Sequence, residues 1–136
     1  TDATIKPYNN HGVWFAHHGV PRFAETSHII TTVPLGVAAA QTLGQASALL
    51  LANHGVAFVG ADVAEMTLAG IFLEKAARFQ IDLASTGFTP LEPDAEETKE
   101  KRDRIYPPKA QRNYWMYFNR KLERYESEHG VGIPII

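Results

Sequence analysis

The spacing of apolar residues changes several times along the chain, and each spacing predicts a different element of secondary structure. Residues 48–52 form a continuous apolar run, Ala-Leu-Leu-Leu-Ala, which is typical of a strand covered on both faces. The polar turn Asn53-His54-Gly55 interrupts this run, and residues 56–59 resume it before Gly60. The pattern therefore predicts two strands joined by a short turn.

A helix is predicted on each side of these strands. The first is capped by Thr31 or Thr32, has Pro34 in its first turn and ends at about Leu43, directly before Gly44. The second, over about residues 62–84, starts with an aspartate and carries Glu65 three positions later, which is the capping-box pattern. Each helix has one apolar face, formed by Leu35, Ala38, Ala39 and Leu43 in the first and by Met66, Ala69, Gly70, Leu73 and Ala77 in the second.

The two ends of the chain give weaker patterns. Val13-Trp14-Phe15, among turn-forming residues near the start, fits either a short strand or one helical turn. Residues 92–104 are dense in charge with almost no apolar stripe, so we expect them to pack poorly on their own. Pro107-Pro108 ends this segment, and residues 109–128 predict a last helix, which completes a C-terminal extension of about residues 92–128. One side of that helix carries Tyr114, Tyr117, Phe118, Leu122 and Tyr125.

Length and composition limit the classes of protein and partner. The chain has 136 residues, of which 45% are hydrophobic and 21% charged, as expected of a single globular domain over residues 1–136. A net charge of −2 provides no basic surface for nucleic acid. The absence of cysteine excludes disulfides and thiol nucleophiles. No apolar run approaches the roughly 18 residues of a membrane span, so we expect a soluble, cytoplasmic protein without nucleic-acid or membrane partners.

His54 is the most informative candidate for chemistry. It lies between two apolar strands and precedes Gly55, which allows a second group to approach the backbone closely. A polar side chain in such a place costs free energy unless it has a partner. Two interpretations remain open. His54 is either a half-buried histidine hydrogen-bonded within a hairpin, or one ligand of a divalent metal whose other ligands lie elsewhere in the fold.

These segments together resemble the C-terminal half of the class II aldolase/adducin family. The resemblance rests on residues 49–62, Leu-Leu-Leu-Ala-Asn-His-Gly-Val-Ala-Phe-Val-Gly-Ala-Asp, and on Leu-Glu-Lys-Ala-Ala-Arg at residues 73–78. Gly-Val-Pro-Arg-Phe at residues 19–23 and the helix near Pro34 match the same layout, so the resemblance covers about residues 5–125. It implies a three-layer α/β/α fold with a mostly antiparallel central sheet flanked by helices. It also implies a homo-oligomer, a tetramer or larger, with active sites between subunits.

In that family three histidines hold a divalent cation, two as a His-x-His pair on a strand and the third in the His-Gly turn. The resemblance assigns His54 as the third ligand of such a metal (Mn, Zn, Fe or Co). The sequence contains no His-x-His pair, and the adjacent His17 and His18 would point to opposite faces of a strand. The chain begins at Thr1 without an initiator methionine. We therefore expect it to be the C-terminal portion of a longer protein of roughly 200–250 residues, with the missing ligands and the catalytic carboxylate upstream.

One branch of the family matches the first part of the chain. His11, Trp14, Phe15 and the segment that contains Arg22 resemble metal-dependent decarboxylases of hydroxylated aromatic or pyridine dicarboxylic acids. His11 falls near the position in the chain where the aldolases carry a catalytic tyrosine. A histidine at that position could deliver the proton that replaces the lost carboxylate. Arg22 would bind a substrate carboxylate. The planar ring would lie against a wall formed by Trp14, Phe15, Tyr114, Trp115 and Tyr117.

Each of these roles has a structural alternative. Arg22 could form a surface ion pair with Glu25, and Trp14 and Phe15 could belong to the core. His11 could lie in an ordinary polar turn. The aromatic stripe of residues 109–128 predicts packing near a subunit boundary or, alternatively, packing on the preceding long helix of the same chain.

Three functions remain as hypotheses. The first is a metal-dependent carbon–carbon lyase of aromatic compound catabolism, a decarboxylase whose substrate is a hydroxylated phthalate- or benzoate-like acid. The second is a sugar-phosphate aldolase or epimerase of the same family. The third is a non-enzymatic, adducin-like module that keeps the fold without the metal.

Overall fold

The computed structural model of the chain describes residues 3–130, which form one three-stranded sheet and five helices. The strands are β1 (Arg22–Phe23), β2 (Ala48–Leu51) and β3 (Gly55–Phe58). β2 lies in the middle, parallel to β1 and antiparallel to β3. The two strands predicted around the Asn-His-Gly turn are therefore present and adjacent.

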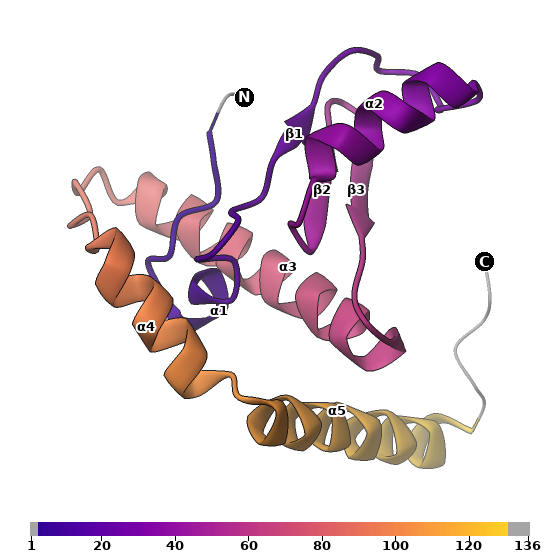
Figure 1. Cartoon of the computed structure of the whole chain (residues 1–136). Helices are drawn as coiled ribbons and strands as arrows, with labels where there is room; N and C mark the ends of the chain where they lie inside the picture. The colour runs from indigo at the N-terminus through magenta and orange to yellow at the C-terminus, as the bar shows by residue number, and fades with distance from the viewer. Residues whose placement is uncertain (1–2, 131–136) are drawn as a thin grey trace.

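The sheet nevertheless differs from the mostly antiparallel central sheet that the family resemblance implies. It is small and mixed, and the described part of the chain is mostly helical (Figure 1). Helix α2 (Val33–Leu43) lies between β1 and β2 in the chain, and such a crossover connects parallel strands. Pro21 directly precedes β1, and the strand does not extend through it because proline has no N–H to donate. The Pro21 carbonyl still accepts a hydrogen bond from the Leu50 N–H at 2.9 Å.

Helices α2 and α3 (Val63–Ser85) cover opposite faces of the sheet. Alternate residues of β2 face the two helices, as the period of a strand requires. Leu49 and Leu51 pack with the residues of α2, whereas Ala48 and Leu50 pack with those of α3. Burial on both faces accounts for the continuous apolar run of residues 48–52, as the sequence predicted.

Both helices begin and end close to the predicted positions. α2 has Pro34 in its first turn and stops at Gly44, whose φ of 56° lies in the region that favours glycine. At the start of α3, Asp62 Oδ1 accepts a hydrogen bond from the Glu65 N–H at 2.8 Å. Glu65 Oε2 in turn accepts from the Ala61 N–H at 2.8 Å, one residue before the usual partner in a capping box.

The charge-dense segment forms a mostly exposed helix, and one side of this helix packs against the rest of the chain. Helix α4 (Ala95–Ile105) begins after Asp94, whose Oδ1 accepts from the Glu97 N–H at 2.8 Å. The less exposed side of α4 carries Thr98, Arg102 and Ile105. Tyr106 follows directly, is 2% exposed, and donates its hydroxyl hydrogen to the Asn10 carbonyl at 2.8 Å.

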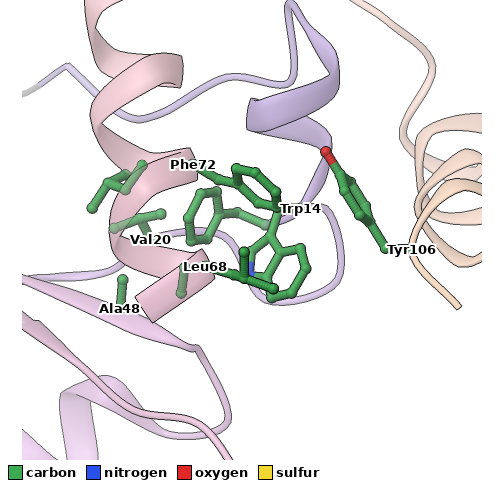
Figure 2. Packing of buried hydrophobic residues seen from close by; sticks show 9 residues of the cluster. Trp14, Val20, Ala48, Leu68, Phe72 and Tyr106 are labelled. Atoms are coloured by element: carbon green, nitrogen blue, oxygen red, sulfur yellow. The ribbon is translucent and has the colours of Figure 1, made fainter. Parts of the chain in front are cut away.

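Four aromatic side chains, which we call the aromatic cluster, join distant parts of the chain: Trp14, Phe72, Tyr106 and Tyr114. The Phe72 ring of α3 lies 5.2 Å from that of Trp14, 5.4 Å from Tyr106 and 5.3 Å from Tyr114, between centroids. Trp14 directly follows the short helix α1 (Asn10–Val13). Figure 2 shows Trp14, Phe72 and Tyr106 packed together, with the Tyr106 hydroxyl toward α1. Of the two predictions for residues 13–15, the helical turn is the one observed.

The last helix, α5 (Pro108–His129), agrees with its predicted bounds within a residue. Its first turns pack on α3 through Tyr114, so the intramolecular alternative holds for that part. Farther along, Tyr117, Leu122 and Tyr125 are exposed. Within residues 3–130, neither α5 nor any other helix is long and apolar enough to cross a membrane.

Candidate functional site

The turn between β2 and β3 presents His54 to solvent. Asn53 has a φ of 57°, in the left-handed region, which an asparagine tolerates better than most residues. The backbone N–H of His54 donates to the Leu51 carbonyl at 3.0 Å and closes the turn. The His54 imidazole lines a cavity of about 230 Å³ together with His28 and the apolar residues Phe23, Ile29, Ile30 and Leu51. The turn therefore leaves the imidazole accessible to a ligand.

The described residues do not by themselves make a metal site. Across residues 3–130, no group of three or more His, Asp or Glu side chains is arranged to hold a metal ion. His54 and His28 share a cavity, but two imidazoles are fewer than the three protein ligands of a typical catalytic zinc site. His17 and His18 lie in a turn rather than on a strand, and they line another cavity. His54 thus fits the role of one ligand in an incomplete set.

Arg22 occupies the neighbouring cavity. This cavity measures about 760 Å³ and lies between the sheet and the second half of α3, with walls that include Leu50, Ala77 and Ile81. The Arg22 guanidinium donates from Nη2 to the Ala3 carbonyl at 2.6 Å. The alternative partner Glu25 forms no ion pair with it in the described structure. Asn53 and Gly55 line the same cavity, so the His54 turn separates the Arg22 cavity from the His54 cavity.

His11 lies on a different part of the surface. Its ring packs against Phe72, with 5.4 Å between centroids, and it lines a cavity of about 320 Å³ with Glu74, Lys75 and Arg78. Burial, and then the positive charge of Lys75, lower the pKa of His11 below the ordinary value of a histidine. The neutral imidazole is therefore favoured near neutral pH, and this form accepts a proton more readily than it delivers one.

The predicted aromatic wall is divided between the core and the surface. Trp14 and Phe15 are 4% and 5% exposed and belong to the main hydrophobic core. Tyr114 packs in the aromatic cluster, while Tyr117 contacts Phe118 at 5.1 Å between centroids and is half exposed. The structure therefore does not bring these aromatic residues together around His54 within one chain.

Arg102 is a further candidate, and it lies in the charge-dense segment of residues 92–104. Its guanidinium carbon lies 5.6 Å from the centroid of the Trp14 ring, and it lines a cavity of about 290 Å³ beside His17 and His18. The signal that could have identified it is the spacing of Thr98, Arg102 and Ile105, which places all three on one face of a helix.

Comparisons with known proteins bear on this architecture. The family model described as the class II aldolase and adducin N-terminal domain matches residues 1–81. The crystal structure of an aldolase II superfamily protein from Pseudomonas syringae is similar, with a TM-score of 0.74 at 23% sequence identity, over 89% of this chain and 49% of that one. The chain thus spans about half the length of that protein, and a likeness at this identity shows the fold alone. No curated protein matches the chain.

Proposed function

Because the chain belongs to the class II aldolase and adducin family, we propose that it forms part of a metal-dependent carbon–carbon lyase. The observation that carries the proposal is the accessible His54 imidazole in the turn between β2 and β3. That turn resembles the His-Gly turn that carries the third metal ligand in the family. A bound divalent ion would polarise substrate oxygens and stabilise negative charge that develops during bond cleavage.

The chain's own residues have separable roles in this proposal. His54 supplies one imidazole, and the other ligands come from outside residues 3–130, because the described residues hold no complete donor set. Arg22 lies in the neighbouring cavity and would bind a substrate carboxylate by charge-assisted hydrogen bonds. The volume and apolar walls of that cavity suit a small planar ring. These features favour a hydroxylated aromatic acid as substrate and decarboxylation as the reaction.

His11 serves a neighbouring subunit in this proposal. Within one chain it lines a cavity that contains neither His54 nor Arg22. An active site between subunits would bring His11 of one chain to the cavity of another. Its lowered pKa keeps the imidazole neutral at rest, so it would first take a proton from solvent or from the substrate hydroxyl before it returns one to the ring.

An assay for carbon dioxide tests this function. We expect the full-length protein, supplied with Mn²⁺, Fe²⁺, Zn²⁺ or Co²⁺, to release carbon dioxide from dihydroxybenzoic or hydroxyphthalic acids. The variant Arg22→Gln should raise KM by about tenfold or more, because a hydrogen-bonded carboxylate loses its charged partner. The matched variant Arg104→Gln changes an exposed arginine on α4 and should leave KM unchanged. Cleavage of a ketose phosphate without carbon dioxide release would assign the protein to the aldolases instead.

The alternative is a non-enzymatic, adducin-like module that keeps the fold without the metal. Elemental analysis of the full-length protein distinguishes the alternatives. A lyase should contain close to one metal ion per subunit, whereas an adducin-like module should contain none.

The exposed part of α5 is proposed as a contact between subunits. Tyr117 and Tyr125 are 54% and 52% exposed and lie on a helix that has no buried residue. Exposed apolar residues that gather on one surface mark interaction sites. We expect the double variant Tyr117→Ser/Tyr125→Ser to form a smaller oligomer than the wild type, measured by light scattering after size-exclusion chromatography.

The control for this prediction is Phe88→Ser, which removes an aromatic side chain that is 77% exposed beyond the end of α3. It should leave the oligomer unchanged. Point substitutions are sharper than deletion of α5, because deletion would also remove Tyr114 from the aromatic cluster. An unchanged mass of the double variant would show that α5 is not the contact.

A further inference from the structure

A fourth cavity, separate from those of His54, Arg22 and His11, gathers basic side chains between the turn after α1 and helix α4. It measures about 290 Å³. Arg102, His17 and His18 line it, together with the neutral polar residues Gln45 and Ser47. These residues come from distant parts of the sequence, so the fold itself assembles the cavity.

Arg102 is held in place before any ligand arrives. Its guanidinium lies over the Trp14 ring at 5.6 Å, and Nη1 donates to Asp103 Oδ1 at 3.3 Å. The Nε atom is buried and has no hydrogen-bond partner, and Nη2 makes no hydrogen bond within the described structure. A partly desolvated guanidinium with unused donors is costly unless an acceptor or a negative charge is nearby.

Asp103 fixes the neighbouring imidazole as well. His17 Nε2 lies 2.8 Å from Asp103 Oδ1. The hydrogen bond from His17, and then that from Arg102, hold the pKa of Asp103 below its usual range, so the carboxylate stays ionised near neutral pH. His18 lies beside His17, with 6.1 Å between ring centroids, and its ring forms no hydrogen bond with the described residues.

Two carboxylates oppose an anion at this cavity: Asp103, which already pairs with Arg102 and His17, and Glu65, which lines the cavity. Glu65 Oε2 already accepts the Ala61 N–H at 2.8 Å, as part of the capping box of α3. The His, Asp and Glu side chains of this cavity do not form a group able to hold a metal ion, in keeping with the rest of residues 3–130. An arginine with free donors beside two imidazoles matches an oxyanion rather than a cation.

We propose that this cavity binds a small oxyanion, a carboxylate or phosphate group, through the Arg102 guanidinium and the His18 imidazole. Gln45 and Ser47 add neutral hydrogen-bond donors from the segment before β2. The volume is at the lower end for ligand cavities and suits one such group with few further atoms. The proposal is independent of the lyase proposal, because it uses none of the residues assigned there to the metal or to proton transfer.

The test is a titration with inorganic phosphate and with malonate, at an ionic strength kept constant with sodium chloride. Binding is followed by the imidazole resonances in NMR spectra of the full-length protein. We expect saturable shifts of the His17 and His18 resonances, and no shift of His129, which stacks on Tyr125 far along α5. The probe that binds more tightly shows whether the cavity prefers a phosphate group or a carboxylate group.

Two variants locate the binding. Arg102→Gln should weaken it at least about tenfold, because the ligand loses a charge-assisted hydrogen bond. His18→Gln changes an exposed side chain and should weaken binding about three- to tenfold with the fold unchanged, so it decides the question even if Arg102→Gln fails to fold. The exposed Arg120→Gln on α5 is the matched control and should bind like the wild type. Shifts that do not saturate, or equal affinity in the wild type and in a folded His18→Gln, would overturn the proposal.

Discussion

The Phe72→Ala variant is expected to lose about 3–5 kcal/mol of the free energy of unfolding, a large part of what a domain of this size has. Phe72 is 1% exposed, and its ring contacts Trp14, Tyr106 and Tyr114. These partners come from the turn after α1, the end of α4 and the start of α5. Truncation would leave a cavity that no single element can fill, because three separate segments would have to move together. Urea unfolding followed by circular dichroism measures the loss.

Phe79→Ala is the matched control for that measurement. It makes the same substitution two turns later on α3, so the change in helix propensity is the same. Phe79 is 41% exposed and lies outside the aromatic cluster. We expect it to cost no more than about 1 kcal/mol. Equal losses in the two variants would show that the aromatic cluster does not connect the helices as described.

The elements of the central part of the chain could be predicted because local pattern and tertiary burial agree there. The run of residues 48–52 is apolar at every position because α2 and α3 cover both faces of β2. The Asp62 and Glu65 side chains satisfy backbone donors at the start of α3, and this depends only on nearby residues. The size and the pairing of the sheet could not be predicted in the same way. β1 has only two residues and therefore no period to detect.

Helix α4 shows why a polar segment can still pack. Its contact with the rest of the chain depends on Thr98, on Arg102 over the Trp14 ring, and on Tyr106 just beyond the helix end. None of these forms an apolar stripe within the segment itself. The aliphatic part of the Arg102 side chain covers apolar surface, while its guanidinium donates a hydrogen bond to the Asp103 carboxylate. A count of apolar residues does not detect this kind of packing.

The candidate site could be predicted residue by residue but not as an arrangement. The position of His54 in an exposed turn follows from the Asn-His-Gly sequence between two strands. Because the sequence contains no distances, reasoning from it places His11, Arg22 and the aromatic residues around one ligand. The structure places His11, Arg22 and His54 in three different cavities and buries Trp14 and Phe15 in the core. A site completed by other chains or segments would be needed to bring His11, Arg22 and His54 close to one ligand.

Removal of His54 is expected to have the largest effect on function. In the full-length protein, His54→Ala should weaken metal binding by at least about 100-fold, since loss of a residue that only supports a ligand already costs 10–100-fold. Turnover should fall with the metal content. The fold should survive, because the side chain is exposed and the turn is held by the backbone hydrogen bond from His54 to Leu51. The free energy of unfolding without metal should change by less than about 0.5 kcal/mol.

Two other histidine variants serve as controls for the His54→Ala measurement. His129→Ala removes an exposed imidazole at the end of α5 and should leave the metal content unchanged. His28→Ala removes the other imidazole of the His54 cavity, and it should retain most of the metal if His28 only borders the site. Metal content is measured by elemental analysis after dialysis, and folding by circular dichroism of the same samples. A His54→Ala protein that keeps one metal ion per subunit and full turnover would remove His54 from the site. A wild-type protein that never binds metal would instead favour the adducin-like module, because the turn would then preserve a ligand's geometry without its function.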